Sequence, residues 1–200
     1  MIQMKTGSIL LSVLMLAGCA SSPPVQYFTL DPIPAQPLSA HRSNTTLQVA
    51  AVHVSALLDR QEMVRQTAAN SIEVNDQHRW ASPLGRMIRR VLTQDLAQRL
   101  SAESVILPNQ SAPRGTALVV IDILQFEADA NGTVVFNGSW SLLHKETHST
   151  AQNYPLHLSA QTDAAGYQAQ ARAMSQIVDR IADAITARLA HDTGASGGKR

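Results

Sequence analysis

The chain contains a single cysteine, Cys19, among its 200 residues. An intrachain disulfide and a metal site built on several cysteines are therefore both excluded. Aromatic residues make up only 4% of the chain and charged residues 16%, whereas hydrophobic residues make up 44%. This composition is that of an ordinary globular protein, and the length suits one domain better than two.

The sequence also lacks an excess of charge of either sign. Its 16 basic residues stand against 15 acidic ones, and one of the basic residues, Lys5, lies in a segment that we expect to be removed. The remaining chain then has a net charge of about zero. A neutral domain has no general electrostatic attraction to polyanions, so we expect no nucleic-acid partner.

Motifs for common enzyme chemistry are missing as well. The sequence contains no Gly-x-Ser-x-Gly nucleophile elbow and no glycine-rich phosphate loop. We therefore expect a protein that is not an enzyme, with no catalytic residues, no metal and no cofactor other than covalent lipid.

The N-terminus carries the strongest motif. An apolar run of eight residues, Ile9–Leu16, follows Lys5. It is too short to cross ~30 Å of hydrocarbon but is typical of a signal peptide. It ends in Leu16-Ala17-Gly18-Cys19, the bacterial lipobox, in which small residues fit the signal peptidase and the thiol accepts diacylglycerol. The sequence therefore predicts a lipoprotein signal peptide at residues 1–18 and diacylglycerol and N-acyl lipid on Cys19.

A plain secretory signal with a chance cysteine is the alternative. It is disfavoured because the only cysteine of the chain occupies the one position that the motif requires. Aspartate after the lipidated cysteine retains Gram-negative lipoproteins in the inner membrane, so Ala20 favours the periplasmic face of the outer membrane. Residues 19–25 form a proline-containing lipidated tether, which spans at most about 25 Å.

Residues 26–191 are predicted to form a single α+β domain, followed by a disordered tail at 192–200. Apolar residues recur at helical spacing from Leu84 to Leu100 and from Gly166 to about His191, which predicts two long amphipathic helices. Ser82 is the expected N-cap of the first helix and Pro83 its first residue. Strands are predicted at residues 27–30, 47–54, 63–67, 70–74, 105–107, 118–126, 133–143 and 156–158. This order predicts a largely antiparallel or mixed β-sheet with both helices packed on one face.

Four segments of the mature chain, taken with the lipobox, resemble the ABC-type transport auxiliary lipoprotein family. These segments are Tyr27–Leu30, Val54–Val64 with Leu58-Asp59-Arg60 inside it, Arg79–Leu84, and Val134–Leu143 with Trp140. The resemblance covers nearly the whole mature chain. The chain departs from the family pattern at Gln61-Glu62, where the family has Pro-Gln, and at Ser82, where it has Glu.

The resemblance implies a role beside proteins with mammalian-cell-entry (MCE) domains, which carry lipids across the periplasm. This chain would then be an outer-membrane lipoprotein that docks the periplasmic MCE tube, and it would form a ring-shaped homo-oligomer. The implied partner is an MCE-domain protein, PqiB-like or linked to an ABC transporter. The alternative is an accessory lipoprotein that stabilises another envelope complex without handling lipid.

Seven charged residues are candidates for a partner or subunit interface. One group is expected to form an inter-subunit ion-pair network, because guanidinium groups suit interfaces: Asp59, Arg60, Arg65 and Arg79. A second group lies on the early turns of the first helix, where a positive charge opposes the helix dipole: Arg86, Arg89 and Arg90.

The second group is a candidate for binding a partner carboxylate or a lipid phosphate. The alternative for both groups is a solvated surface with ion pairs worth ~0–1 kcal/mol. In that alternative, the arginines of the first helix form ion pairs with Asp76 or Asp95. Trp80 and Trp140 are predicted to lie in the core, and residues 118–124 to form a buried central strand under the helices rather than to line a lipid passage.

Overall fold

The computed structural model describes residues 23–35, 46–144 and 152–196. The predicted signal peptide and the lipobox residues Leu16, Ala17, Gly18 and Cys19 lie outside the described residues. The elements are β1 (Gln26–Phe28), β2 (Leu47–Val54), β3 (Glu62–Ala68), β4 (Ser71–Trp80), α2 (Leu84–Leu100), η2 (Ala102–Ser104), β5 (Val105–Ile106), β6 (Ala117–Ala128), β7 (Thr133–His144), β8 (Gln152–Gln161) and α3 (Tyr167–Ser196).

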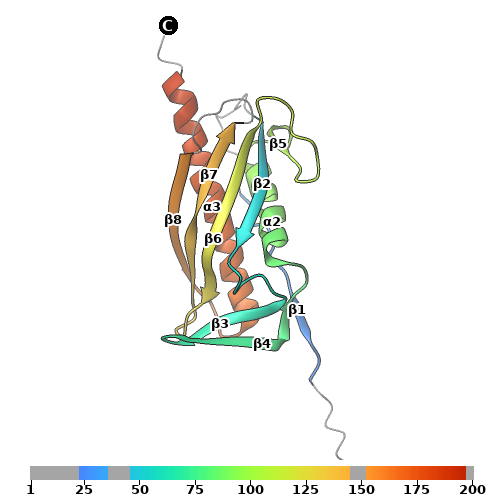
Figure 1. Ribbon diagram of the computed structural model, residues 1–200, viewed down its shortest axis with the longest axis vertical. Helices are drawn as coiled ribbons and strands as arrows, with labels where there is room; N and C mark the ends of the chain where they lie inside the picture. Colours follow the sequence, from blue (N-terminus) through green and yellow to red (C-terminus); the bar gives the residue numbers. More distant parts are fainter. Residues whose placement is uncertain (1–22, 36–45, 145–151, 197–200) are drawn as a thin grey trace, which may run out of the picture.

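The strands form one mixed sheet of eight strands, in which β6 is central (Figure 1). Strand β6 pairs in parallel with β2 and antiparallel with β7, and β7 pairs antiparallel with β8. At its far end β6 also meets β3, through Ala128 and Arg65. The β3–β4 hairpin thus extends the sheet at that end, and β1 pairs in parallel with the last residues of β4.

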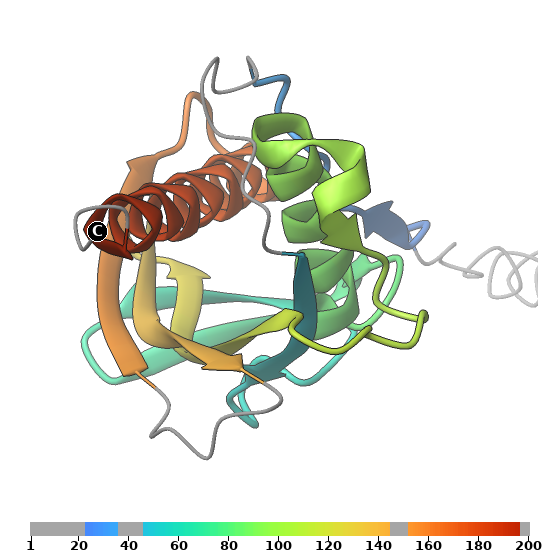
Figure 2. The same cartoon turned by 90° about the horizontal axis from the view of Figure 1, so that it is seen from above.

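Both long helices lie on one face of the sheet, which curves part of the way around them (Figure 2). The predicted α+β architecture is confirmed. The core lies between this face and the helices, because the side chains of β6 alternate across the sheet. Val119, Ile121 and Ile123 are buried under the helices, whereas Asp122 and Leu124 are exposed on the other face.

The prediction for residues 118–124 is therefore right about the central position and wrong about full burial, since only one face of the strand is covered. Both tryptophans lie in the core as predicted: Trp80 and Trp140 are each only 3% exposed. Trp140 stacks on Tyr154 of β8, with ring centroids 4.3 Å apart.

The ends of the two helices differ from the sequence prediction. Helix α2 begins at Leu84, and Pro83 rather than Ser82 takes the N-cap position, with no side-chain cap. The extended backbone of Pro83 (ψ 130°) points its carbonyl along the helix, where it accepts hydrogen bonds from the N–H groups of Arg86 and Met87. Helix α3 continues to Ser196, beyond the end predicted near His191.

Two predicted hairpins are confirmed. The turn between β3 and β4 contains Asn70 with φ of 60°, and the turn between β6 and β7 contains Gly132 with φ of 77°, a value that favours glycine. Strand β8 is longer than predicted and includes Pro155, which lies opposite Ser139 of β7. Its inward residues, Tyr154, Leu156 and Leu158, pack against the core.

Candidate functional site: the N-terminal strap and the arginines of helix α2

Residues 29–35, here called the N-terminal strap, connect β1 to the rest of the domain and lie against both long helices. Leu30 of the strap is fully buried. Four side chains of the helices bind the strap backbone: Arg90 to the Leu30 carbonyl (2.6 Å), Ser175 to the Asp31 N–H (3.2 Å), Asp95 to the Ile33 N–H (3.2 Å) and Gln98 to the Ala35 N–H (2.9 Å). The strap is therefore held against both long helices by hydrogen bonds along residues 30–35.

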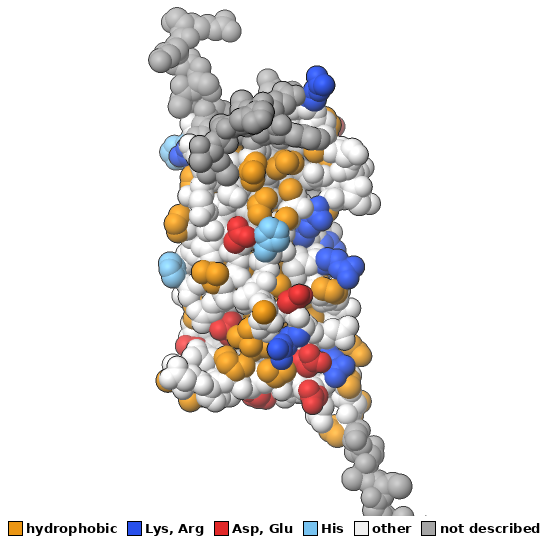
Figure 3. Space-filling view, in the orientation of Figure 1, with side chains coloured by type: hydrophobic (Ala, Val, Ile, Leu, Met, Phe, Trp, Pro, Cys, Tyr) orange, Lys and Arg blue, Asp and Glu red, His pale blue; other side chains and the backbone are white. Residues whose placement is uncertain are grey.

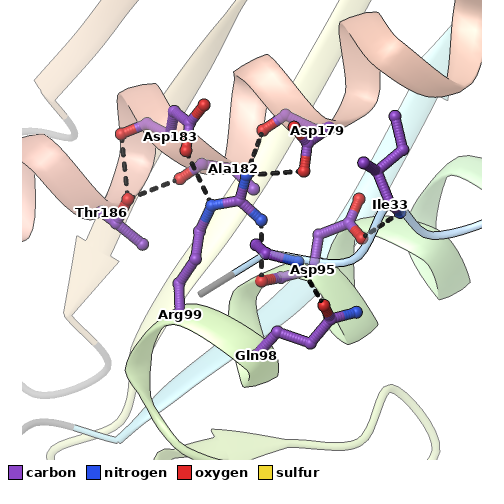
Figure 4. A network of polar contacts seen from close by, with 9 residues as sticks. Ile33, Asp95, Gln98, Arg99, Asp179, Ala182, Asp183 and Thr186 are labelled. Carbon is purple, nitrogen blue, oxygen red and sulfur yellow. Dashed lines mark hydrogen bonds and ion pairs between the residues drawn. The ribbon is translucent and has the colours of Figure 1, made fainter. Parts of the chain in front are cut away.

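An ionic cluster behind the strap joins the two helices (Figure 4). The Arg99 side chain, only 5% exposed, binds the carboxylates of Asp179 (2.6 Å) and Asp183 (2.7 Å) on α3. It also donates to the backbone carbonyl of Asp95 at 3.1 Å. Sequence analysis missed this cluster. Its signal was a charged pair one turn apart on each helix, within an otherwise apolar face.

Asp95 is the buried acid of this cluster. Its Oδ1 accepts the Ile33 N–H, and its Oδ2 is buried without a hydrogen-bond partner among the described residues. Burial raises the pKa of Asp95 to about 7, and repulsion from Asp179 adds to that rise, while the Ile33 N–H and Arg99 act in the opposite direction. Asp95 is thus a carboxyl group that titrates near neutral pH.

The three arginines at the start of α2 have different environments. Arg89 donates to the backbone carbonyls of Val49 (2.8 Å) and Pro108 (2.9 Å), so it connects α2 to β2 and to the loop after β5. Arg90 binds the strap. Arg86 is exposed, and its side chain forms no hydrogen bond or ion pair with another described residue.

The predicted pairing of these arginines with Asp76 or Asp95 is wrong. Asp95 accepts the Ile33 N–H of the strap, and among the described residues none of the three arginines pairs with its carboxylate. The backbone carbonyl of Asp76 accepts from Arg79 of its own strand, at 2.9 Å. Of the three helix arginines, Arg86 is therefore the one whose guanidinium is available to a partner.

The residues of the predicted ion-pair network make separate local contacts in the single chain. Asp59 and Arg60 are exposed in the turn between β2 and β3. Arg65 lies over the ring of Tyr167, 4.9 Å from its centroid. Arg79 is 3.5 Å from Glu62 on the neighbouring strand. The inter-subunit network stays a prediction, since it requires contacts between chains.

An aromatic group fixes β1 and the hairpin to α3, and sequence analysis missed it too. The ring of His78 on β4 stacks on Tyr167 of α3 with centroids 4.2 Å apart. The ring centroid of Phe28 on β1 lies 5.8 Å from that of His78 and 6.5 Å from that of Tyr167. The Tyr167 hydroxyl donates to Glu73 at 2.9 Å. Burial, then the hydrogen bond to Glu73 and its negative charge, raise the pKa of Tyr167 to about 12.

The face of the sheet opposite the helices is open to solvent (Figure 3). Hydrophobic side chains gather on it in two groups, with charged side chains between them. Leu124 is 77% exposed there, and the His53 imidazole lies 2.8 Å from the Asp122 carboxylate. No cluster of three or more His, Cys, Asp or Glu side chains that suits a metal occurs in the described part of the chain.

Three hollows of the described surface have volumes of about 540, 490 and 450 Å³ and are open to solvent. The first lies among the β3–β4 hairpin, the β6–β7 turn and the loop before α3, the second beside the strap, and the third between β2 and the start of α2. Polar side chains contribute to the lining of each. Within the described residues, no helix has the length and apolar character needed to span a bilayer.

Fold and surface thus define an α+β domain that offers open surfaces and a fixed N-terminal strap. The family described as "ABC-type transport auxiliary lipoprotein component" matches residues 28–186, and the chain belongs to this family. The family resemblance predicted from the sequence is confirmed. The match includes the strap, the arginines of α2 and the Arg99 cluster.

Two relatives with known names also match the chain. The chain is 29% identical to the intermembrane transport lipoprotein PqiC of Escherichia coli K12 over 146 residues, which cover 71% of this chain and 76% of the relative. The PqiC protein of Shigella flexneri matches with the same identity and coverage. The chain is therefore a PqiC-like transport auxiliary lipoprotein.

Solved structures share the fold. An uncharacterized protein superposes with a TM-score of 0.71 at 22% identity, over 84% of this chain and 99% of that one. Protein XCC0632 from Xanthomonas campestris superposes with a TM-score of 0.61 at 16% identity, over 86% and 99%. At these identities the likeness concerns the fold alone.

Proposed function

We propose that this chain is an outer-membrane lipoprotein, held by lipid on Cys19, that docks the periplasmic tube of an MCE-type lipid transport system. In this proposal its partner is an MCE-domain protein, PqiB-like or linked to an ABC transporter. The chain acts without catalysis, as one subunit of a homo-oligomer at the membrane end of the tube.

The observation that carries the proposal is the family match over residues 28–186, together with a relative whose name is an intermembrane transport lipoprotein. The lipobox Leu16-Ala17-Gly18-Cys19 supports attachment to a membrane, and Ala20 supports the outer membrane. Durable anchoring is expected because two or three acyl chains bury many methylenes, at ~0.8 kcal/mol each.

The surface of the domain supports a docking role rather than carriage of lipid inside one subunit. The three hollows described above are open and partly polar. An acyl chain would stay in contact with water there, which costs about 25 cal/mol per Å² of apolar surface. The proposal therefore assigns the lipid passage to the MCE tube or to the space between assembled subunits.

Capture of the partner tests the docking role. The full-length lipoprotein, extracted from native membranes with its lipid, is expected to retain a periplasmic MCE-domain protein from the same cells. A lipoprotein with an unrelated domain behind the same lipobox is the control. Capture of a different envelope complex without any MCE protein would instead favour the accessory role and contradict the docking proposal.

Two matched variants test the anchor. Cys19→Ala is expected to leave the domain folded and to release it from membranes, because covalent lipid rather than the fold holds it there. Ala20→Asp keeps the lipid and is expected to move the protein from the outer to the inner membrane. If Cys19→Ala still sediments with membranes after a salt wash, the anchoring argument is wrong.

A further inference from the structure

The point at which the tether leaves the domain is fixed. The ring of Phe28 packs beside His78, and the backbone carbonyl of Phe28 accepts the Ala81 N–H at 2.8 Å. The strap behind it is bound by both helices, as described above. The tether therefore begins from a rigid position on β1, at the end of the domain that carries the β3–β4 hairpin (Figure 1).

The opposite end of the domain is far from this position. Strand β5 pairs with the first residues of β2, and Ala117 at the start of β6 lies beside the same residues. The hairpin meets the other end of β6, at Ala128. The twelve residues of β6 span about 40 Å. That separation exceeds the reach of the tether, about 25 Å from Cys19 to β1.

Exposed apolar side chains occur at the end from which the tether leaves. Val25 is 42% exposed and Tyr27 is 63% exposed, directly beside the tether. Ile72 and Val74 of β4 are 40% and 37% exposed, on a strand whose outer edge is paired only at its last three residues, by β1. An exposed tyrosine such as Tyr27 suits the boundary between lipid headgroups and acyl chains, because its ring is apolar and its hydroxyl is polar.

We propose that this end of the domain, formed by β1 and the β3–β4 hairpin, rests on the bilayer that holds the lipid anchor, with Tyr27 at the level of the headgroups. The inference depends on the proposed lipidation of Cys19. The end with β5 and Leu107 then points away from the membrane, towards a partner in the periplasm.

The contact does not depend on charge. Strands β3 and β4 carry three acidic residues, Glu62, Glu73 and Asp76, against Arg65 and Arg79. Both arginines have partners within the domain. Nothing in these strands attracts anionic lipid, so the contact relies on apolar side chains and on the high local concentration that the anchor provides. Its extent should therefore not change with salt.

Site-specific fluorescence quenching tests the orientation. Because the only cysteine carries the lipid, one introduced cysteine gives a single labelling position in the full-length lipoprotein. Ile72→Cys and Leu107→Cys are matched, since both side chains are exposed and apolar (40% and 51%) and lie at opposite ends. In vesicles of phosphatidylethanolamine and phosphatidylglycerol with headgroup nitroxides, we expect several-fold stronger quenching at Ile72→Cys than at Leu107→Cys, in low and high salt.

A second pair of variants tests the apolar contact itself. Val25→Ser with Tyr27→Ser should reduce quenching at Ile72→Cys, while the protein stays on the vesicles. Leu143→Ser, on the open sheet face and 37% exposed, is the control and should leave quenching unchanged. Equal quenching at both ends on vesicle-bound protein would overturn the orientation alone. Protein that does not float with vesicles would overturn the anchor as well.

Discussion

The guanidinium of Arg99 turns away from the carboxylate of Asp95, although the two residues lie one turn apart on α2. Arg99 gives its ion pairs to Asp179 and Asp183 across the helix interface, and to Asp95 only a hydrogen bond at the backbone carbonyl. The Arg99 guanidinium therefore forms ion pairs with two of the three neighbouring carboxylates. The third, Asp95, accepts from a backbone N–H of the strap and from no other donor in the described part of the chain.

This arrangement predicts a stability that depends on pH. The pKa of Asp95 is about 7 in the folded chain and has the ordinary value of 3.8 in the unfolded chain. Between these values the folded chain holds a proton that the unfolded chain has lost, so stability falls as pH rises. The loss is complete above pH ~7 and absent below pH ~4, and it amounts to on the order of 4 kcal/mol.

Asp95→Asn separates this effect from other titrations. The amide can still accept the Ile33 N–H but carries no charge at any pH. By urea unfolding, we expect the stability that the variant gains over the parent to be larger at pH 8 than at pH 5. Raised stability of the variant by the same amount at both pH values would show that Asp95 does not titrate in this range.

Removal of one partner from the Arg99 cluster should be strongly destabilising, because it leaves a buried charge without compensation. Arg99→Met leaves Asp179 without its partner next to the buried Asp95, and we expect a loss of about 3 kcal/mol. Arg172→Met is the matched control, because Arg172 binds Asp163 at a similar distance of 2.8 Å but on the exposed surface. That control should show no measurable loss. Similar losses for both variants in urea unfolding would contradict the role of burial.

The local elements of this fold could be predicted from the sequence, because their signals lie within a few residues. Apolar residues at helical spacing indicated α2 and α3, and the Asn131-Gly132 turn indicated the β6–β7 hairpin. The partners of each element could not be predicted in the same way. Asp31 bonds to Ser175, 144 residues away, so the strap depends on how the whole chain packs.

The candidate site shows the same division. The lipobox is a contiguous motif and could be recognised directly. In contrast, Arg86 and Arg89 are equivalent in the sequence, and only their distances to β2 and to the loop after β5 distinguish a free guanidinium from a structural one. The Arg99 cluster joins residues that lie 80 and 84 positions apart, and no local pattern specifies that contact.

Strands β6 and β7 approach each other closely at Gly138, so we expect substitution of this glycine to destabilise the fold. Gly138 of β7 lies opposite Ile123, where β6 has an irregular register. A Cβ atom at Gly138 would be 2.4 Å from the carbonyl oxygen of Asp122. Because the backbone of β6 or β7 would have to move, we expect Gly138→Ala to lower the free energy of unfolding in urea by about 3 kcal/mol.

Gly115→Ala is the control for Gly138→Ala. Gly115 has φ of 77°, and nothing lies within 4 Å of a Cβ built there. Its substitution should cost only the conformational strain, about 1 kcal/mol. Equal costs at the two positions would show that the strands separate easily and that the close approach is unimportant.

The arginines of α2 allow docking to be separated from folding. Arg89→Met removes the donor to the carbonyls of Val49 and Pro108, so we expect a loss of about 1 to 2 kcal/mol of stability. Arg86→Met removes no such bond and should unfold like the parent.

If an acidic partner surface meets this part of α2, Arg86→Met should nevertheless weaken capture of the MCE-domain protein, and raised salt should weaken capture by the parent. Unchanged capture by Arg86→Met, at unchanged stability, would remove the start of α2 from the docking surface and leave the open sheet face and the loop after β5 as the positions to substitute next.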